Sequence, residues 1–213
     1  MKKLAFIILP LFVCGLLANA QTTVYTYDKT KGKERAKVVW KETVTPKGKD
    51  VVLKDGSKTY TQSIGADDAT VKWHYVNTAN GTDYTVVFNG DIYRISGKVK
   101  GKAIDKEEHT SGYPWCQNIS VKGGPLLKKK GDKLTYECIR PDTGGLQHMV
   151  ATNVGTTTIN GIAVNDLKVN PSGALAKMWS CHDFCDASTG VLVKFQAVEG
   201  IPGTPETVWI LEK

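Results

Sequence analysis

A short stretch near the end of the chain gathers the side chains that could do metal or redox chemistry. It reads KMWSCHDFCD and contains Met178, Cys181, His182 and Cys185. Thiolate and imidazole groups are common ligands for zinc and copper, and a cysteine pair can instead form a disulfide or a redox-active dithiol. The stretch is therefore a candidate metal site, redox site or disulfide, and the cellular compartment bears on the choice.

The redox and metal interpretations both lack the usual spacing. A dithiol oxidoreductase normally carries Cys-x-x-Cys at the start of a helix, whereas Cys181 and Cys185 have three residues between them. A metal site would need further ligands from elsewhere in the fold, for which His148 and Met149 are the nearest candidates by type. We expect no metal and no cofactor.

The chain begins like an exported protein. Lys2 and Lys3 precede an apolar stretch over 4–17, and the small residues of ANA end at Ala20. This pattern is typical of a secretory signal peptide with cleavage after Ala20. An alternative makes Cys14 a lipidated N-terminus, but Val13 is larger than the residue that usually precedes such a cysteine. We expect a periplasmic or secreted protein.

The charge of the remaining chain is moderately positive and scattered. The leader contains two lysines and no acid, so the net charge of +7 falls to +5 on cleavage. The one tight basic run, Lys128 to Lys130, has no aromatic residues between its lysines. A solvated hairpin tip explains this run better than nucleic-acid binding, and peripheral contact with the envelope stays open. We expect no nucleic-acid partner and a monomer.

Export leaves four cysteines, an even number in an oxidising compartment, which favours disulfides. If Cys116 and Cys138 lie on two strands of a hairpin, its centre falls in the 123–132 connection and they can face each other. Closing such a loop would contribute about 3 kcal/mol.

The pairing of Cys181 and Cys185 depends on the local backbone. A turn at residues 182–184 would bring the two side chains together as a second bridge, which we favour. A straight strand would hold them ~13 Å apart on one face, too far for a disulfide. Exchanged pairings with Cys116 or Cys138 remain a further alternative.

The fold class follows from regular turns and alternating residues. Asn-Gly or Asp-Gly pairs such as Asp55-Gly56, Asn80-Gly81 and Asn160-Gly161 are typical of hairpin turns. Between the turns, residues alternate: Val71, Trp73 and Tyr75 fall on one face, with polar residues between them. We predict an all-β protein whose antiparallel meander closes into an up-and-down barrel or a deep half-barrel, with little or no helix.

We expect residues 21–213 to form a single domain. No repeat or linker divides them, and the segment SGYPWCQ around Pro114 is the best candidate for a seam between two halves of one sheet. The one place where a short helical turn is expected is 144–147. A barrel of this size can enclose a ligand, and the aromatic residues predicted to line such a cavity are Trp73, Tyr75, Trp115, Trp179 and Trp209. The alternative is that most of the tryptophans simply fill the core.

The second half of the chain resembles a class of uncharacterised exported bacterial proteins. The resemblance covers residues 110–213 and rests on the stretches PWCQNIS, CIRPDTGGLQHMVA and MWSCHDFCDASTGVLVKF. These proteins carry a Pro-Trp-aromatic-Gln motif and are related in architecture to the Lol lipoprotein carriers, whose curved sheet holds acyl chains. The resemblance implies a carrier of hydrophobic ligands and a straight strand at 181–185. Cys116 stands where the motif usually has an aromatic residue.

No catalytic motif is present. The sequence has no Gly-x-Ser-x-Gly, no phosphate-binding glycine loop and no His-Glu-x-x-His. The adjacent acids Asp67-Asp68 and Glu107-Glu108 would point to opposite faces of a strand. We therefore predict an apolar or lipid-like small molecule bound in a β-barrel cavity. The alternatives are an enzyme acting on envelope glycans or lipids, a structural or assembly factor, and a metal-binding protein.

Overall fold

The computed structural model describes residues 20–66, 69–173, 179–198 and 204–212. Most of the predicted leader with Cys14, the Asp67-Asp68 pair and Met178 lie outside the described residues. The first eight strands are β1 (Gln21–Lys31), β2 (Glu34–Thr45), β3 (Gly48–Asp55), β4 (Lys58–Gly65), β5 (Thr70–Asn77), β6 (Thr82–Phe88), β7 (Ile92–Val99) and β8 (Lys102–His109). After the helix α1 (Ile119–Leu126) follow β9 (Lys133–Ile139), β10 (Leu146–Ile159), β11 (Ile162–Pro171), β12 (Cys181–Asp186), β13 (Leu192–Val198) and β14 (Glu206–Leu211).

All these strands belong to one antiparallel sheet. Its order is β8-β7-β6-β5-β4-β3-β2-β1-β14-β13-β12-β11-β10-β9. Strands that follow each other in the sequence are therefore neighbours, except β8 and β9. β1 and β14 also pair, although they are far apart in the sequence, and there Tyr27 lies opposite Leu211. The first strand, β1, and the last described strand, β14, therefore pair near the middle of the sheet. The two edge strands of the sheet are β8 and β9.

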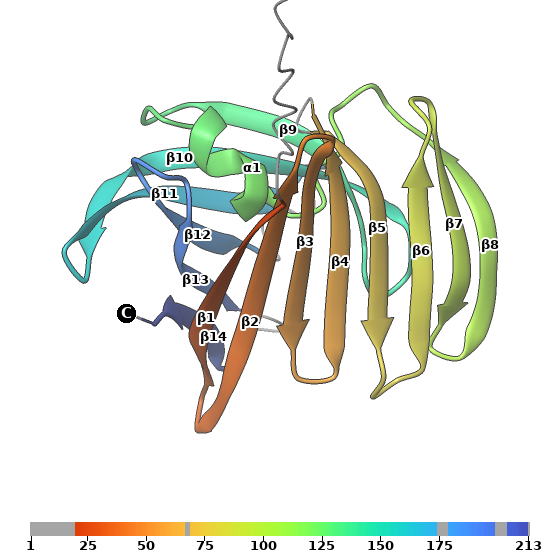
Figure 1. Cartoon of the computed structure of the whole chain (residues 1–213), viewed down its shortest axis with the longest axis horizontal. Helices are drawn as coiled ribbons and strands as arrows, with labels where there is room; N and C mark the ends of the chain where they lie inside the picture. The colour runs from red at the N-terminus through yellow and green to blue at the C-terminus, as the bar shows by residue number, and fades with distance from the viewer. Residues whose placement is uncertain (1–19, 67–68, 174–178, 199–203, 213) are drawn as a thin grey trace, which may run out of the picture.

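The sheet bends into a deep half-barrel. In Figure 1, β1 to β8 form one curved wall, and β9 to β14 turn behind and beside it. The prediction of an all-β meander forming a deep half-barrel is confirmed. Among the described residues, no helix has the length and apolar character needed to cross a bilayer.

The gap between β8 and β9 is bridged by the connecting segment and by side chains. The backbone of Cys116 donates to Glu137 O at 2.9 Å and that of Glu137 donates to Pro114 O at 3.0 Å, so the segment runs parallel to β9. Tyr93 on β7 donates its hydroxyl to Glu137 Oε2 at 2.6 Å. The seam expected around Pro114 thus lies where the structure has its two sheet edges.

The predicted alternation holds along β5 with one exception. Trp73 and Tyr75 are buried, and Lys72 and His74, which precede them, are not. Val71 does not continue the inner face, because the pairing of β5 with β4 shifts there and leaves Val71 41% exposed. Thr70 is buried instead and accepts a hydrogen bond from Gln62 at 2.8 Å.

The single described helix was not predicted. Its sequence ISVKGGPL contains two glycines and a proline, which are poor helix formers and hide any helical periodicity. Asn118 caps its start, since its side chain accepts from the backbone of Ser120 at 3.1 Å, and the helix packs on β11, β12 and β13. The helical turn expected at 144–147 is wrong: Gly144 ends a tight turn and β10 begins at Leu146.

Candidate functional site: a cavity inside the half-barrel

A large cavity occupies the concave side of the sheet. Its volume is about 940 Å³, and residues from both walls, from α1 and from the β9–β10 turn line it. Its aromatic lining residues are Trp40, Tyr60, Trp73, Tyr75, Tyr136, Trp179, Phe195 and Trp209. Polar side chains are a minority of the lining, as in most pockets that bind small molecules.

Four of the five aromatic residues predicted for a cavity line it: Trp73, Tyr75, Trp179 and Trp209. Trp115 does not. It lies 2% exposed in the seam, edge-on to Phe88 and Tyr93 at 5.9 Å and 5.3 Å between ring centres. The connecting segment turns this ring toward β7, which the sequence alone could not show.

Sequence reasoning missed Trp40, Tyr60, Tyr136 and Phe195 as cavity residues. Burial alternates along β2 around Trp40, so its face was predictable in principle, whereas burial does not alternate along β9 around Tyr136 or along β13 around Phe195. Which inward residues border open space, and which fill the core, depends on the curvature of the sheet.

Trp209 stands out among the lining residues because its indole N–H is unsatisfied. The Nε1 atom is buried and has no hydrogen-bond partner among the described residues. Its ring lies 4.7 Å from that of Phe195 and 6.4 Å from that of Tyr27, measured between ring centres. Leaving a buried donor unpaired costs about 1–3 kcal/mol. Thr207 Oγ1 on the same strand is also buried without a partner among the described residues, although Thr207 does not line the cavity.

Asp183 supplies a fully buried carboxyl group to the cavity lining. It lies on β12 with 3% exposure and accepts a short hydrogen bond from the Ser120 hydroxyl of α1. Burial raises the pKa of Asp183 to about 6, although the Ser120 bond and the neighbouring His182 oppose the shift. This carboxyl links the helix to the sheet.

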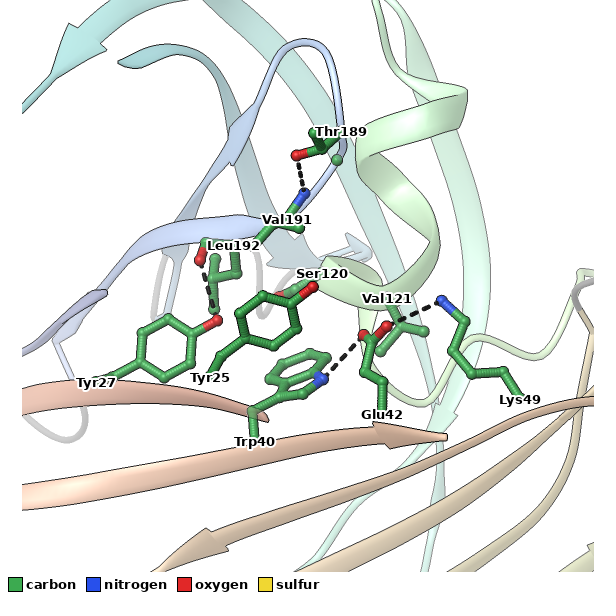
Figure 2. Close-up of a pocket in the computed structure, with 11 residues that line it drawn as sticks. Tyr25, Tyr27, Trp40, Glu42, Lys49, Ser120, Val121, Thr189, Val191 and Leu192 are labelled. Atoms are coloured by element: carbon green, nitrogen blue, oxygen red, sulfur yellow. Dashed lines mark hydrogen bonds and ion pairs between the residues drawn. The ribbon is translucent and has the colours of Figure 1, made fainter. Parts of the chain in front are cut away.

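A second, smaller pocket of about 80 Å³ lies beside the cavity, between α1, β1, β2 and the β12–β13 turn (Figure 2). In it Trp40 donates its indole N–H to Glu42 Oε1 at 2.9 Å, and Lys49 lies 3.5 Å from the other carboxylate oxygen. Tyr27 donates its hydroxyl to Leu192 O at 3.0 Å. Its volume suits a few water molecules rather than an organic ligand.

The expected bridge between Cys181 and Cys185 is wrong. The chain does not turn at 182–184: β12 runs straight through it, with Cys181, Asp183 and Cys185 facing inward. Four residues along one strand separate the two cysteines by about 13 Å, so they cannot bond to each other. Burial raises the pKa of the Cys185 thiol, as befits an inert core cysteine.

Cys116 and Cys138 lie beside each other, but not in a hairpin. The parallel bridge between Trp115 and Glu137 puts the next residue of each segment, Cys116 and Cys138, in neighbouring register. Both side chains belong to the same buried cluster. Burial raises the pKa of the Cys138 thiol to about 12. A disulfide between them stays a prediction.

The stretch CHDFC does not form one ligand set. The alternation of β12 sends His182 to the opposite face from Cys181 and Cys185, where its Nδ1 lies 2.6 Å from Asp166 Oδ1. Within the described ranges, no three His, Cys, Asp or Glu side chains are grouped so that they could hold a metal ion.

A serine, a histidine and a glutamate meet at the seam without the geometry of a catalytic triad. Ser111 Oγ lies 3.0 Å from His148 Nε2, and Glu137 Oε1 lies 3.5 Å from that same nitrogen. A triad needs the nucleophile and the acid on opposite ring nitrogens. Glu137 instead accepts hydrogen bonds from Tyr93, Thr110 and the backbone of Ser111. It therefore links β9 to β7 and to the segment after β8 across the seam.

The fold is similar to that of a β-barrel-like protein from Brucella abortus with a domain of unknown function, DUF1849. The TM-score is 0.63 at 10% sequence identity, over 89% of this chain and 95% of that chain. Weaker similarity links it to the hypothetical lipoprotein YmcC of Escherichia coli, with a TM-score of 0.42, 16% identity and coverage of 95% and 92%. A DUF1329 protein from Desulfovibrio piger gives 0.28, 8% identity and coverage of 92% and 85%.

No protein-family model and no curated protein sequence matches the chain. The similarity to the Brucella protein supports a β-barrel-like fold and nothing finer, because fold alone does not determine function. That architecture agrees with the resemblance to barrel-shaped envelope proteins, while the Pro-Trp-aromatic-Gln motif stays a prediction.

Proposed function

We propose that this is an exported protein that binds a hydrophobic or amphipathic molecule inside its half-barrel. The cavity is the observation that carries the proposal. Its volume of about 940 Å³ lies in the upper part of the range for ligand pockets, and aromatic side chains from both walls border it. A structural protein without a ligand would gain stability by filling this space.

Trp209 supports the same proposal independently. Its buried N–H needs an acceptor, and none is present among the described residues. An ester, amide or carboxylate oxygen of a bound molecule would satisfy it, as would a trapped water molecule. The expected ligand therefore combines an apolar body with at least one oxygen acceptor.

Export is supported by the leader pattern at the start of the sequence. We place the protein in the periplasm or outside the cell. Lys128 to Lys130 are exposed on the connection between α1 and β9, so a peripheral contact with anionic envelope surfaces is open to them. Nucleic acid is not proposed as a partner.

Enzymatic activity has weaker support. Glu137 and His148 meet at the seam and are occupied there in holding the sheet edges together. The cavity lining has two carboxyl groups: Asp183 accepts from Ser120, and Asp142 is paired with Arg140 in the β9–β10 turn. Both are therefore engaged, whereas glycan hydrolysis needs two facing carboxyl groups.

The proposal is tested by blocking the cavity from inside. Gln147 on β10 lines the cavity, whereas Val150 on the same strand does not, so Gln147→Trp and Val150→Trp add the same side chain inside and outside. Binding is measured as the fluorescence gain of an uncharged naphthylamine dye, after lipid removal by partial unfolding and refolding.

We expect saturable dye binding to the parent protein and to Val150→Trp, and at least about tenfold weaker binding to Gln147→Trp, because an indole excludes the dye from the space it fills. Native mass spectrometry of protein purified gently from the envelope should show a lipid-sized adduct lost on denaturation. Equal dye binding by all three proteins would place the dye elsewhere and contradict the proposal.

A further inference from the structure

One group of the polar residues that line the cavity lies at a rim of the half-barrel, away from the polar lining around α1. The β3–β4, β5–β6 and β7–β8 turns lie together at the lower edge of the wall in Figure 1. Lys58 follows the first of these turns and pairs with Asn77, which precedes the second. Both residues line the cavity, as does Asn80 in the second turn.

The β9–β10 turn brings an arginine to the same rim. Tyr84 at the start of β6 donates its hydroxyl to Arg140 O at 2.9 Å, which fixes this turn against the opposite wall. Arg140 and Asp142 both line the cavity. Asp142 is close enough to Tyr75 on β5 for its charge to raise the pKa of that phenol, after the larger effect of burial.

The acids near this rim already have cationic partners. Asp55 accepts from Lys29 Nζ at 2.7 Å through each carboxylate oxygen. Asp142 accepts from Arg140 Nε at 3.1 Å and from Arg140 Nη2 at 2.7 Å. Lys58 is half-buried and has no carboxylate partner among the described residues, so the rim carries an excess of positive charge.

Lys58 and Arg140 each have N–H donors that make no hydrogen bond to a described residue. The Lys58 ammonium offers three N–H groups, and Arg140 keeps its Nη1 group, which makes no hydrogen bond to a described residue. A guanidinium and an ammonium on one rim suit a carboxylate or a phosphate. The polar lining around α1 has the opposite character, because it contains the carboxyl group of Asp183.

We propose that the molecule bound in the cavity carries an anionic headgroup, a carboxylate or a phosphate, held between Lys58 and Arg140. This inference rests on the proposed function, since it orients the ligand of the same cavity. The apolar body extends from this rim along the aromatic walls. Asn77 and Asn80 supply neutral hydrogen bonds beside the two cations.

The test compares three probes that share a twelve-carbon chain: dodecanoate, dodecyl phosphate and dodecanol. Their dissociation constants are measured at neutral pH and low salt by displacement of the uncharged dye. The protein carries Lys58→Gln with Arg140→Gln, or the matched control Lys54→Gln. Lys54 is exposed on β3 near the same turn and does not line the cavity. Unfolding curves check that each variant is folded.

We expect at least one anionic probe to bind about tenfold or more tightly than dodecanol, the range of one or two charge-assisted hydrogen bonds. The double variant should lose that preference and keep its affinity for dodecanol, and Lys54→Gln should keep both. Added salt should weaken only the anionic preference. Stronger binding of dodecanoate would indicate a fatty-acid type of ligand, and stronger binding of dodecyl phosphate a phosphate-bearing lipid.

Two results would overturn the inference. Equal binding of all three probes would refute the anionic headgroup and leave the cavity proposal intact. An anionic preference that survives in the double variant would move the headgroup site elsewhere. If no probe binds at all, the proposed function itself fails, which is a different result from either of these.

Discussion

The seam at β8 and β9 differs from the wall of β13 and β14 in how far its buried polar groups are satisfied by hydrogen bonds. At the seam, the fully buried Glu137 accepts from two hydroxyl groups and one backbone N–H. Beside it, the indole of Trp115 donates to Gln117 at 3.1 Å. On the far wall, the buried indole N–H of Trp209 has no partner among the described residues.

This contrast separates structural from binding surfaces. A seam that replaces strand pairing must satisfy its own polar groups, because each unpaired one costs stability. The β14 wall has two buried polar groups without a partner among the described residues, the Thr207 hydroxyl and the Trp209 N–H, and of these only Trp209 belongs to a residue that lines the cavity, where a ligand could supply the acceptor. The comparison predicts that seam variants lose stability and that wall variants lose binding.

The largest effect is expected at Glu137. Glu137→Ala should lower the free energy of unfolding by about 3 kcal/mol or more. The substitution opens a cavity and leaves the hydrogen-bond donors of Tyr93, Thr110 and Ser111 without an acceptor. Urea unfolding followed by tryptophan fluorescence measures the loss. Glu108→Ala removes a carboxylate that pairs with Lys106 at a more exposed position, and should cost less than about 1 kcal/mol. Similar losses for both variants would refute the special role of the seam.

A disulfide between Cys116 and Cys138 would strengthen the same seam. It would close a loop of more than twenty residues, for which about 3 kcal/mol of stabilisation is expected. We expect peptide mapping of protein exported to an oxidising compartment to find this bond and a Cys185 thiol. Reduction should lower the unfolding midpoint of the parent and of Cys185→Ser equally. A bond between Cys181 and Cys185 would contradict the straight β12 strand, and a bond from Cys185 to Cys116 or Cys138 would contradict the predicted pairing.

Asp183 gives stability a pH dependence that Asp183→Asn should abolish. The pKa of Asp183 is raised to about 6, above about 3.9 for an unfolded aspartate. Between these values the folded state holds the proton and the unfolded state does not, so stability falls as pH rises from about 4 to about 6.

We therefore expect Asp183→Asn to gain on the order of 2 kcal/mol relative to the parent between pH 4 and pH 7. Chemical unfolding at both pH values measures the difference. Asp132→Asn, which alters a half-buried carboxylate that accepts from the Lys129 backbone N–H, provides the control and should show little change with pH. A difference between parent and Asp183→Asn that does not depend on pH would contradict the buried, protonated carboxyl.

The smallest change in stability is expected at Trp209. Trp209→Phe removes the unsatisfied N–H, so the free energy of unfolding should change by less than about 1 kcal/mol. A probe that carries an ester oxygen in its apolar body should bind roughly fivefold to tenfold more weakly, because that oxygen loses a donor. Trp40→Phe removes an N–H that Glu42 already satisfies, and should instead cost stability. Unchanged ligand affinity in Trp209→Phe would remove Trp209 from the site.

Much of the fold was accessible from the sequence because sheet structure is encoded locally. Turn pairs such as Asn80-Gly81, together with alternation such as Trp73 and Tyr75, predict strands from their own neighbours. The helix α1 was missed because its residues disfavour a helix, which forms through its cap and its packing on distant strands. Tertiary packing overrode propensity there.

The candidate site was only partly predictable for a related reason. Period-two alternation tells which side chains face inward, and it placed Trp73, Tyr75 and Trp209 on inward faces. Trp179, which precedes β12, was predicted only as one of the aromatic residues spread along the chain. It does not tell which inward residues meet packed neighbours, so Trp115 was misplaced and Phe195 was missed. Lys58 and Arg140 carry no local signal, because they line one cavity only after the β9–β10 turn crosses to the other wall.

The sequence by itself determined the export pattern, the strand-rich class, the turns and the faces of the strands, since each depends on residues close together in the chain. Only the tertiary structure decided the central pairing of β1 with β14, the straight course of β12 and the seam that Glu137 fastens. The cavity belongs with these, because it is the space left when distant strands curve toward each other without filling it.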